Sequence, residues 1–347
     1  MKRARRRKRA TIADVAETAG VSVATVDRVL SGRLPVKEHT ASLVLKAAES
    51  IGFHATPLLK TRLSPDAKRR RFGFLLQKPD EFYRQFAGDL EAATRAAAFG
   101  RVRASIEFVP ELSPSAIAER MRRLGAASDA IGVVAVDHPI VWEAVADLRA
   151  KGVPAFALLS DLSSDARAGY IGRDNRKEGR TAGWIIAHAA RAAGEIGVIV
   201  GSHRYLCQET AEISFRAYFR EFAADFTLLE PLVNLDDSRL AYAAVADLLA
   251  KRDNLVGLYI CGGGMAGVVA AAREAGLAGR VAIVCNELIP PTRAGLVEGV
   301  LTAVISTPTA ALSRSALEEM ERALAKGFDG PPRNCVSPFE LLLPTNV

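Results

Sequence analysis

The sequence predicts two joined parts: a small all-α headpiece with a helix-turn-helix, and a two-lobed α/β body built on doubly wound parallel sheets. At 347 residues, 49% of them hydrophobic, the chain is long enough for two or three domains with a large core. Residues 1–71 carry 17 Lys and Arg against 6 Asp and Glu, whereas the remainder carries 29 against 33. A basic head on a mildly acidic body indicates a module that binds a polyanion. From residue 72 onward, short apolar runs alternate with segments of helical period.

The stretch from Thr11 to Leu30, TIADVAETAGVSVATVDRVL, predicts the helix-turn-helix. Its apolar residues recur three or four positions apart, and Gly20 interrupts them. Ser22 follows as an N-cap for a second helix. We therefore predict helices over 12–19 and 23–30, the second of which can enter a DNA major groove. A helical hairpin that serves only as core is the alternative.

A third helix is predicted over 40–51, which completes a DNA-binding domain over residues 11–55. Arg28 is the best candidate for reading a base, because its guanidinium can pair with guanine O6 and N7. Hydroxyl side chains position a helix on phosphates without reading sequence. The candidate DNA contacts around the second helix are Thr11, Ser22, Val23, Ala24, Thr25, Asp27 and Arg28.

Residues 1–10 form a basic tail that we expect to be disordered in isolation, because its like charges repel one another. Directly before a helix-turn-helix, phosphate or minor-groove contacts are the favoured interpretation of this tail. A solvated tail without contacts is the alternative.

The headpiece sequence, followed by a third helix that ends in IGF, resembles the lactose-repressor (LacI) family over about 45 residues without a gap. Asp27 stands where a serine is more usual in that family. The resemblance implies that residues 56–71, a basic linker with Pro57 and Pro65, form a hinge helix on DNA and insert a leucine into the minor groove. Arg62 stands where that leucine is expected, so Leu59 and Leu63 are the candidates. A flexible tether is an equal alternative.

The body, residues 72–347, is predicted to alternate strands and helices. The predicted strands are 72–76, 104–109, 130–136, 154–159, 169–172, 196–201, 228–233, 256–261, 281–286 and 300–306. The predicted helices are 86–99, 113–124, 141–150, 176–193, 209–222, 238–250, 265–275 and 310–326. This body resembles the periplasmic-binding-protein-like effector domain of the same family, which implies two lobes with a ligand between them.

Ligands in open α/β sheets bind outside the carboxyl ends of the strands, so the polar and aromatic residues at those ends are the candidates. Any one of them is as consistent with a cap or a turn, as Asp174 and Asn175 illustrate. Together they resemble a sugar-type site, in which Phe82 and Tyr83 stand where the family stacks aromatics on a sugar ring. The candidate effector contacts are Asp80, Phe82, Tyr83, Asp137, His138, Ser160, Asp161, Glu209, Glu287 and Thr307.

Several positions depart from the family's sugar-binding pattern. Glu209 stands where many members have an arginine, and glycines replace a usual Asn-Asp pair after strand 256–261. The result is a predicted pocket with carboxylates and no evident arginine. We expect it to disfavour phosphate and carboxylate ligands, which would meet like charge, and to accept a neutral polyol or an amine-bearing ligand.

The main rival interpretation is an enzyme or regulator that binds NAD(P). Gly262–Gly267 reads G-x-G-x-x-G between a strand and a helix, and Glu287 lies where the ribose-binding acid belongs. The motif lies late in the chain, with little room for a second half. An exported transport protein is disfavoured, since the basic N-terminus has no apolar core of a signal peptide.

The sequence contains four cysteines, without metal-ligand spacing, and no apolar run of about 18 residues. We therefore expect a cytoplasmic protein without a metal or cofactor, which is not an enzyme. The predicted function is a transcriptional regulator, most simply a repressor. It is expected to bind a pseudo-palindromic double-stranded DNA operator as a homodimer under the control of a small molecule.

Overall fold

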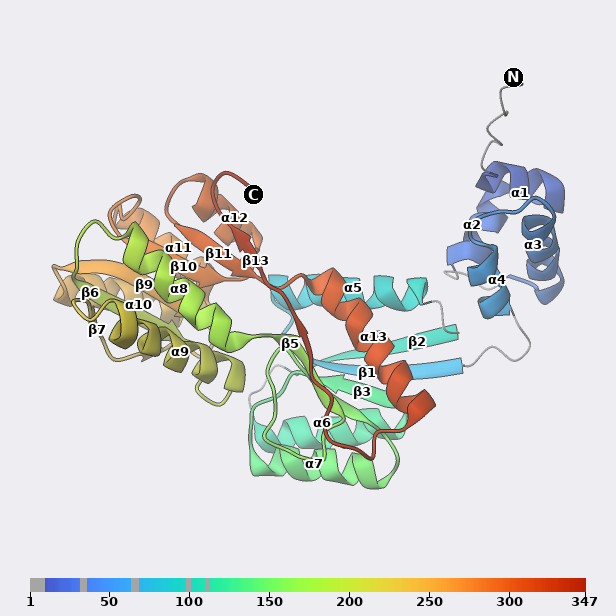
Figure 1. Ribbon diagram of the computed structural model, residues 1–347, viewed down its shortest axis with the longest axis horizontal. Helices are drawn as coiled ribbons and strands as arrows, with labels where there is room; N and C mark the ends of the chain where they lie inside the picture. Colours follow the sequence, from blue (N-terminus) through green and yellow to red (C-terminus); the bar gives the residue numbers. More distant parts are fainter. Residues whose placement is uncertain (1–9, 32–35, 64–68, 98–100, 110–112) are drawn as a thin grey trace, which may run out of the picture.

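The computed structural model describes residues 10–31, 36–63, 69–97, 101–109 and 113–347, which form a helical headpiece and a body of two lobes (Figure 1). Each lobe contains one sheet with helices on both faces, so the predicted fold class is confirmed. The predicted contacts of the basic tail lie outside the described residues, except for Ala10.

The headpiece contains the predicted helix-turn-helix. Helices α1 (Ile12–Ala19), α2 (Val23–Ser31) and α3 (Glu38–Ser50) begin and end within two residues of the predicted bounds. Thr11 begins α1 because its hydroxyl accepts the Asp14 N–H (3.3 Å), while the Asp14 carboxylate accepts the Thr11 N–H (2.7 Å). Gly20 ends α1 in the left-handed region (φ 65°), where a residue with a Cβ would be strained.

A fourth helix, α4 (Thr56–Leu63), occupies the first half of the predicted linker and packs against α3. Leu59 lies on it and is fully buried in the headpiece core with Val26, Val44 and Phe53. The prediction that Leu59 contacts DNA is therefore wrong for this structure, because a side chain enclosed by protein is not free to enter a groove. Leu63 ends α4, and its side chain lies outside the described part of the chain.

The N-terminal lobe has a parallel sheet in the order β12-β5-β4-β3-β1-β2. Its strands are β1 (Arg69–Gln77), β2 (Arg101–Val109), β3 (Ala130–Val133), β4 (Ala155–Leu158), β5 (Gly169–Arg173) and β12 (Cys335–Ser337). Helices α5 (Glu81–Ala96) and α13 (Thr309–Lys326) cover one face, and α6 (Pro114–Ala126) and α7 (Pro139–Ala150) the other (Figure 1). The central strands β3 and β4 are buried along their whole length, as expected for a sheet covered on both faces.

The C-terminal lobe has a sheet in the order β13-β11-β10-β9-β6-β7, with β8 also paired to β6. Its strands are β6 (Glu195–Val200), β7 (Thr227–Leu228), β8 (Leu232–Val233), β9 (Leu255–Cys261), β10 (Ala282–Asn286), β11 (Ala303–Ser306) and β13 (Glu340–Leu342). Helices α8 (Asn175–Ala189) and α9 (Leu206–Phe222) pack on one side. Helices α10 (Ser238–Lys251), α11 (Met265–Glu274) and α12 (Pro290–Val297) pack on the other.

Two details differ from the sequence predictions. The predicted strand 228–233 is wrong as a single strand, because it is divided into β7 and β8 around Pro231, which has no N–H to donate to a neighbouring strand. The sequence pattern also missed α12, β12 and β13, which are short or exposed elements.

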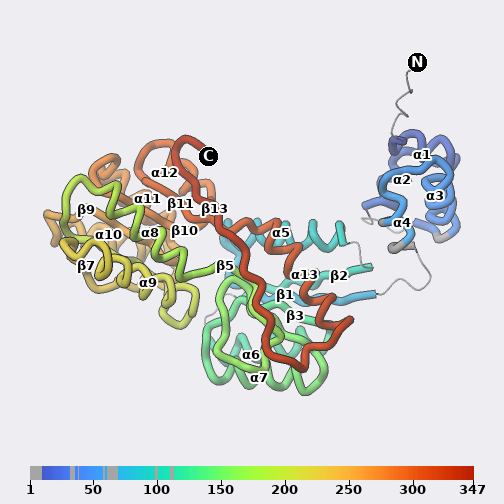
Figure 2. The backbone as a smooth tube through the Cα atoms, viewed as in Figure 1, coloured from blue at the N-terminus to red at the C-terminus, as the bar shows by residue number. Residues whose placement is uncertain are grey.

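The chain crosses between the lobes three times, and the crossings lie side by side (Figure 2). The first leads from β5 to α8, the second from β11 to α13, and the third from β12 to β13. Strand pairing holds them together, since Ser337 pairs with Arg173, and Ser306 pairs with Glu340. This arrangement places the carboxyl ends of strands from both sheets at the contact between the lobes.

Candidate functional site

The headpiece presents one face of α2 to solvent while the other face packs in its core. Val26 and Val29 are buried, whereas Val23 (53% exposed), Asp27 and Arg28 are exposed. This face offers a guanidinium, a carboxylate and an apolar group, which are three kinds of side chain that contact base edges in a major groove. The geometry is that of a recognition helix.

The three predicted phosphate-binding hydroxyls all lie at helix starts. The Ser22 hydroxyl accepts the Thr25 N–H (3.1 Å) and hydrogen-bonds to the Thr25 hydroxyl (2.9 Å). Thr11 caps α1 in the same way. These hydroxyls therefore have a role in starting the two helices, and their contact with phosphate stays a prediction.

Strained backbone marks the contact between the lobes. Among the described residues, the non-glycine residues with positive φ are Leu159 (63°), Leu235 (53°), Asp236 (55°) and Glu287 (63°). Each follows the carboxyl end of a strand: β4, β8 or β10. Such conformations cost of order 1–3 kcal/mol each and cluster at ligand-binding sites. They indicate that this contact is a functional site.

Each lobe inserts an aromatic side chain into the other. Phe82, from α5 of the N-terminal lobe, packs against the hydrophobic core of the C-terminal lobe. Tyr205, which precedes α9 of the C-terminal lobe, lies 1% exposed within the core of the N-terminal lobe. Tyr83 lies beside Phe82 with ring centroids 5.1 Å apart. The lobes therefore share apolar surface in this closed arrangement.

Polar contacts also join the lobes. The Lys78 ammonium donates to the backbone carbonyl of Asp236 (2.7 Å), and the Cys207 N–H donates to the Ser160 hydroxyl (3.3 Å). Burial raises the pKa of the Asp236 carboxyl above its ordinary value, although the Gly263 N–H donates to it at 2.5 Å. Burial likewise raises the pKa of Asp80, which caps α5. Lys78, Asp80, Asp236, Tyr83, Tyr205 and Cys207 are termed the interlobe cluster below.

A buried ion network, the crossing network, lies where the chain passes between the lobes. Arg173, at the end of β5, pairs with Glu178 (3.0 Å) and Glu287 (3.2 Å) and donates to the backbone carbonyl of Ile305 (3.2 Å). Glu287 also accepts the N–H and the hydroxyl of Thr307, both at 2.8 Å. The network therefore links the first crossing to the strand that leads into the second.

Opposing effects act on the pKa values of this network. Burial alone would lower the pKa of Arg173, but the two carboxylates raise it above its ordinary value, so the guanidinium stays charged. Burial raises the pKa of Glu178, which Arg173 and hydrogen bonds from Asn286 and Tyr259 oppose.

The structure brings together part of the predicted effector site. Asp80, Phe82, Tyr83, Ser160, Glu287 and Thr307 all lie at the contact between the lobes or in the crossing network. The other predicted residues have partners of their own or lie apart. Asp137 accepts from the Trp142 indole (2.6 Å), and His138 caps α7. Asp161 pairs with Arg167 (2.7 Å), while Glu209 lies in the first turn of α9.

The sequence reasoning missed five residues of the site: Lys78, Arg173, Glu178, Tyr205 and Asp236. The expectation of a pocket without an arginine is wrong, because Arg173 lies beside Glu287. It directly precedes Asp174, which caps α8 as the sequence suggested, and its position at the end of β5 was the available signal. Asp236 gave no such signal because it follows a strand of two residues.

The glycines of Gly262–Gly267 serve packing within the C-terminal lobe. A Cβ on Gly267 would lie 1.8 Å from the Ser238 carbonyl oxygen, and one on Gly264 would lie 2.5 Å from the Asn234 amide nitrogen. The Asp236 carboxylate already accepts the Gly263 N–H, and Thr307 and Arg173 already hold Glu287. The dinucleotide interpretation is therefore not supported, since the chain's own groups use the atoms that a pyrophosphate and a ribose would need.

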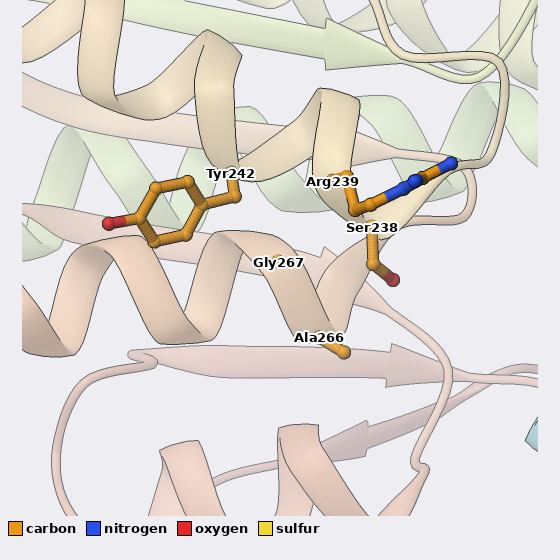
Figure 3. A pocket seen from close by; sticks show the side chains of 5 residues that line it. All are labelled: Ser238, Arg239, Tyr242, Ala266 and Gly267. Atoms are coloured by element: carbon orange, nitrogen blue, oxygen red, sulfur yellow. The ribbon is translucent and has the colours of Figure 1, made fainter.

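A surface hollow of about 360 Å³ lies between α10 and α11, lined by Ser238, Arg239, Tyr242, Ala266 and Gly267 (Figure 3). In Figure 3 the Tyr242 ring lies over α11. Its hydroxyl donates to Glu274 (2.5 Å). None of the predicted effector contacts lines this hollow.

In the described parts of the chain, no helix is long and apolar enough to cross a membrane. Within those same ranges, no group of His, Cys, Asp and Glu side chains is arranged to hold a metal ion. Burial raises the pKa of the Cys207 thiol to about 12, so this cysteine of the interlobe cluster is no nucleophile at neutral pH.

Two families match the chain. Residues 11–56 match the family described as bacterial regulatory proteins, lacI family, and residues 109–327 match the family described as periplasmic binding protein domain. These matches cover the headpiece and most of the body. A comparison with curated protein sequences finds no match.

Solved structures of transport proteins share the fold of the body. One is an ABC transporter solute binding protein from Burkholderia graminis in complex with D-arabinose, at 18% identity and a TM-score of 0.74, covering 81% of this chain and 97% of that one. Another, from Agrobacterium vitis, is bound with α-D-tagatopyranose, at 18% identity and a TM-score of 0.73, covering 80% and 95%. A third, from Actinobacillus succinogenes with bound D-allose, has 18% identity and a TM-score of 0.72, covering 80% and 98%.

Proposed function

Since this chain belongs to the periplasmic binding protein domain family and carries a LacI-family regulatory domain ahead of it, we propose that it is a transcriptional regulator controlled by a sugar or polyol. The observation that carries the proposal is the joining of two modules in one chain. The headpiece exposes a recognition helix, and the body has the two-lobed fold of sugar-binding proteins.

The headpiece is proposed to bind a DNA operator through α2. Arg28 reads a base, while Val23 and Ala24 contact base edges or thymine methyl groups. The basic residues of the N-terminal tail neutralise phosphates and release counterions, so binding weakens as salt rises. Asp27, on the same exposed face, alters the base preference.

A single headpiece buries too little surface to hold one site tightly at physiological salt. We therefore propose a homodimer on a pseudo-palindromic operator, acting in the cytoplasm and without enzymatic activity. Equilibrium sedimentation of the full chain, alone and with operator DNA, measures the stoichiometry. A strictly monomeric protein on a single half-site would contradict this part of the proposal.

The small molecule is proposed to bind between the lobes and to change their closure. The headpiece precedes β1 of the N-terminal lobe, so a rotation of that lobe moves the headpiece. In a dimer, such a rotation changes the separation of the two headpieces and shifts the population able to span both half-sites.

The test selects duplex DNA bound by the full chain from a random pool and measures its affinity with and without a panel of sugars and polyols. We expect one selected motif with two related halves and at least one compound that shifts the DNA affinity. Binding to all duplexes alike, with the same salt dependence, would refute a sequence-specific regulator. Indifference to the whole panel would refute the effector class.

A further inference from the structure

We propose that the small molecule bound between the lobes carries a protonated amino group as well as hydroxyl groups, as an amino sugar does. This inference rests on the proposed function and names the chemical class of the effector. It is based on the charge at the contact between the lobes and on buried acceptor atoms there that have no donor.

The first half of the argument is the interlobe cluster. Asp80 and Asp236 come from opposite lobes and lie within electrostatic reach of each other and of Lys78. The Lys78 ammonium donates to the backbone carbonyl of Asp236, so its charge is shared between two carboxylates. One cation between two carboxylates leaves a net negative charge, and a buried unbalanced charge is costly.

The crossing network repeats this imbalance. Arg173 is the one cation that pairs with two carboxylates, Glu178 and Glu287, and both pairs are largely removed from water. Each network therefore has two carboxylates to one cation. Neither Lys78 nor Arg173 is available to balance a further anion, so a phosphate or carboxylate ligand would increase an existing imbalance.

The two networks border one region. The Cys207 thiol, fully buried, lies within electrostatic reach of Glu178 and Arg173 on one side and of Asp236 on the other. Tyr83 lies within reach of Tyr205, Asp236 and Asp80. A ligand in this region meets the charge of both networks.

Buried acceptors without donors are the independent second observation. The Tyr205 hydroxyl, on a side chain that is 1% exposed, has no hydrogen-bond partner. The Asn286 amide donates to Glu178 (2.8 Å), but its oxygen, on a side chain 6% exposed, has none. A buried polar atom without a partner costs about 1–3 kcal/mol, so these atoms indicate a missing donor. An ammonium supplies three N–H donors together with the positive charge that the carboxylates lack.

The experiment uses the full chain and isothermal titration calorimetry with matched pairs of probes. The pairs are D-glucosamine and D-glucose, D-galactosamine and D-galactose, and D-mannosamine and D-mannose, at a pH that keeps the amines protonated. We expect at least one amino sugar to bind about tenfold or more tightly than its hydroxyl counterpart, as expected for a charged hydrogen bond. The N-acetylated form, which has no positive charge, is expected to lose this advantage.

Two conservative variants and a matched control locate the effect. Asp236→Asn keeps an acceptor for the Gly263 N–H and tolerates the left-handed backbone, and Asp80→Asn keeps the cap of α5. Either is expected to reduce the preference for the amine to below about threefold. Asp237→Asn makes the same chemical change at the exposed cap of α10 and is expected to keep the full preference.

The outcomes separate the two proposals. If a hydroxyl sugar binds as tightly as its amino counterpart in every pair, the amine inference is overturned while the sugar-effector proposal stands. If no member of any pair binds a correctly folded protein, both are overturned. An amine preference that survives both Asp80→Asn and Asp236→Asn overturns the assignment of the charge to this region. Circular dichroism of each variant verifies folding.

Discussion

Truncation of Leu59 tests whether α4 belongs to the headpiece core or serves as a contact to DNA. Leu59 is fully buried and packs with Val26, Val44 and Phe53. Leu→Ala at such a site costs about 2–5 kcal/mol, through lost burial and the cavity left behind. A folded domain of this size has a stability of roughly 3–8 kcal/mol. Leu59→Ala is therefore expected to remove about half of the headpiece's stability.

Hydrogen exchange of the full chain, followed by mass spectrometry, measures this loss. A destabilisation of about 3 kcal/mol increases the exchange of protected amides in α1 and α3 by more than about 100-fold, while both lobes stay unchanged. The matched control is Leu43→Ala, at a 38% exposed position of α3, with an expected effect within about 0.5 kcal/mol. If Leu59→Ala weakens DNA binding while exchange in the headpiece stays as in the wild type, the burial argument is refuted and Leu59 acts at the DNA.

Three further predictions concern the two binding regions. Arg28→Ala should weaken binding to the selected operator by about 1–3 kcal/mol and relax the preference at one base pair, and an unchanged base preference in a binding-site selection would contradict this. Arg173→Met should destabilise the body by about 3–5 kcal/mol, because it leaves buried carboxylates without their counter-charge, and denaturant unfolding of the variant decides the point. Asp236→Asn should raise the melting temperature at pH 7.5, because burial raises the pKa of this carboxyl above its ordinary value and so favours its neutral form in the fold. The gain should shrink as the pH falls through the raised pKa and the wild-type carboxyl becomes protonated; a gain independent of pH would refute the charge argument.

The layered architecture was predictable because its elements follow local patterns. The helix-turn-helix has an uninterrupted helical period with a capping hydroxyl and a single glycine, and the central strands are continuous apolar runs. Elements that depend on distant partners were not predictable. β12 and β13 are exposed segments of three residues, and they form strands only because β5 and β11 offer free edges far away in the sequence.

The candidate site divides along the same line. Phe82 and Tyr83 follow a recognisable strand, so the rule of carboxyl strand ends found them. Tyr205 follows β6 by five residues, in a turn whose approach to the other lobe depends on the tertiary fold. Leu59 was misjudged for a related reason, since a short basic segment with two prolines does not reveal that α3 will bury one face of it.

The three adjacent crossings determine which motions of the lobes are available. Two rigid bodies joined by one strand can twist, slide and bend in any direction. Three segments side by side, tied by strand pairing at Ser337 and Glu340, resist twisting and sliding and leave bending about one axis. Wherever the small molecule makes its contacts, its binding free energy is therefore directed into a single angular coordinate. Cutting the chain between β12 and β13 would restore the other motions, and a ligand could then bind as tightly while its signal to the headpiece is lost.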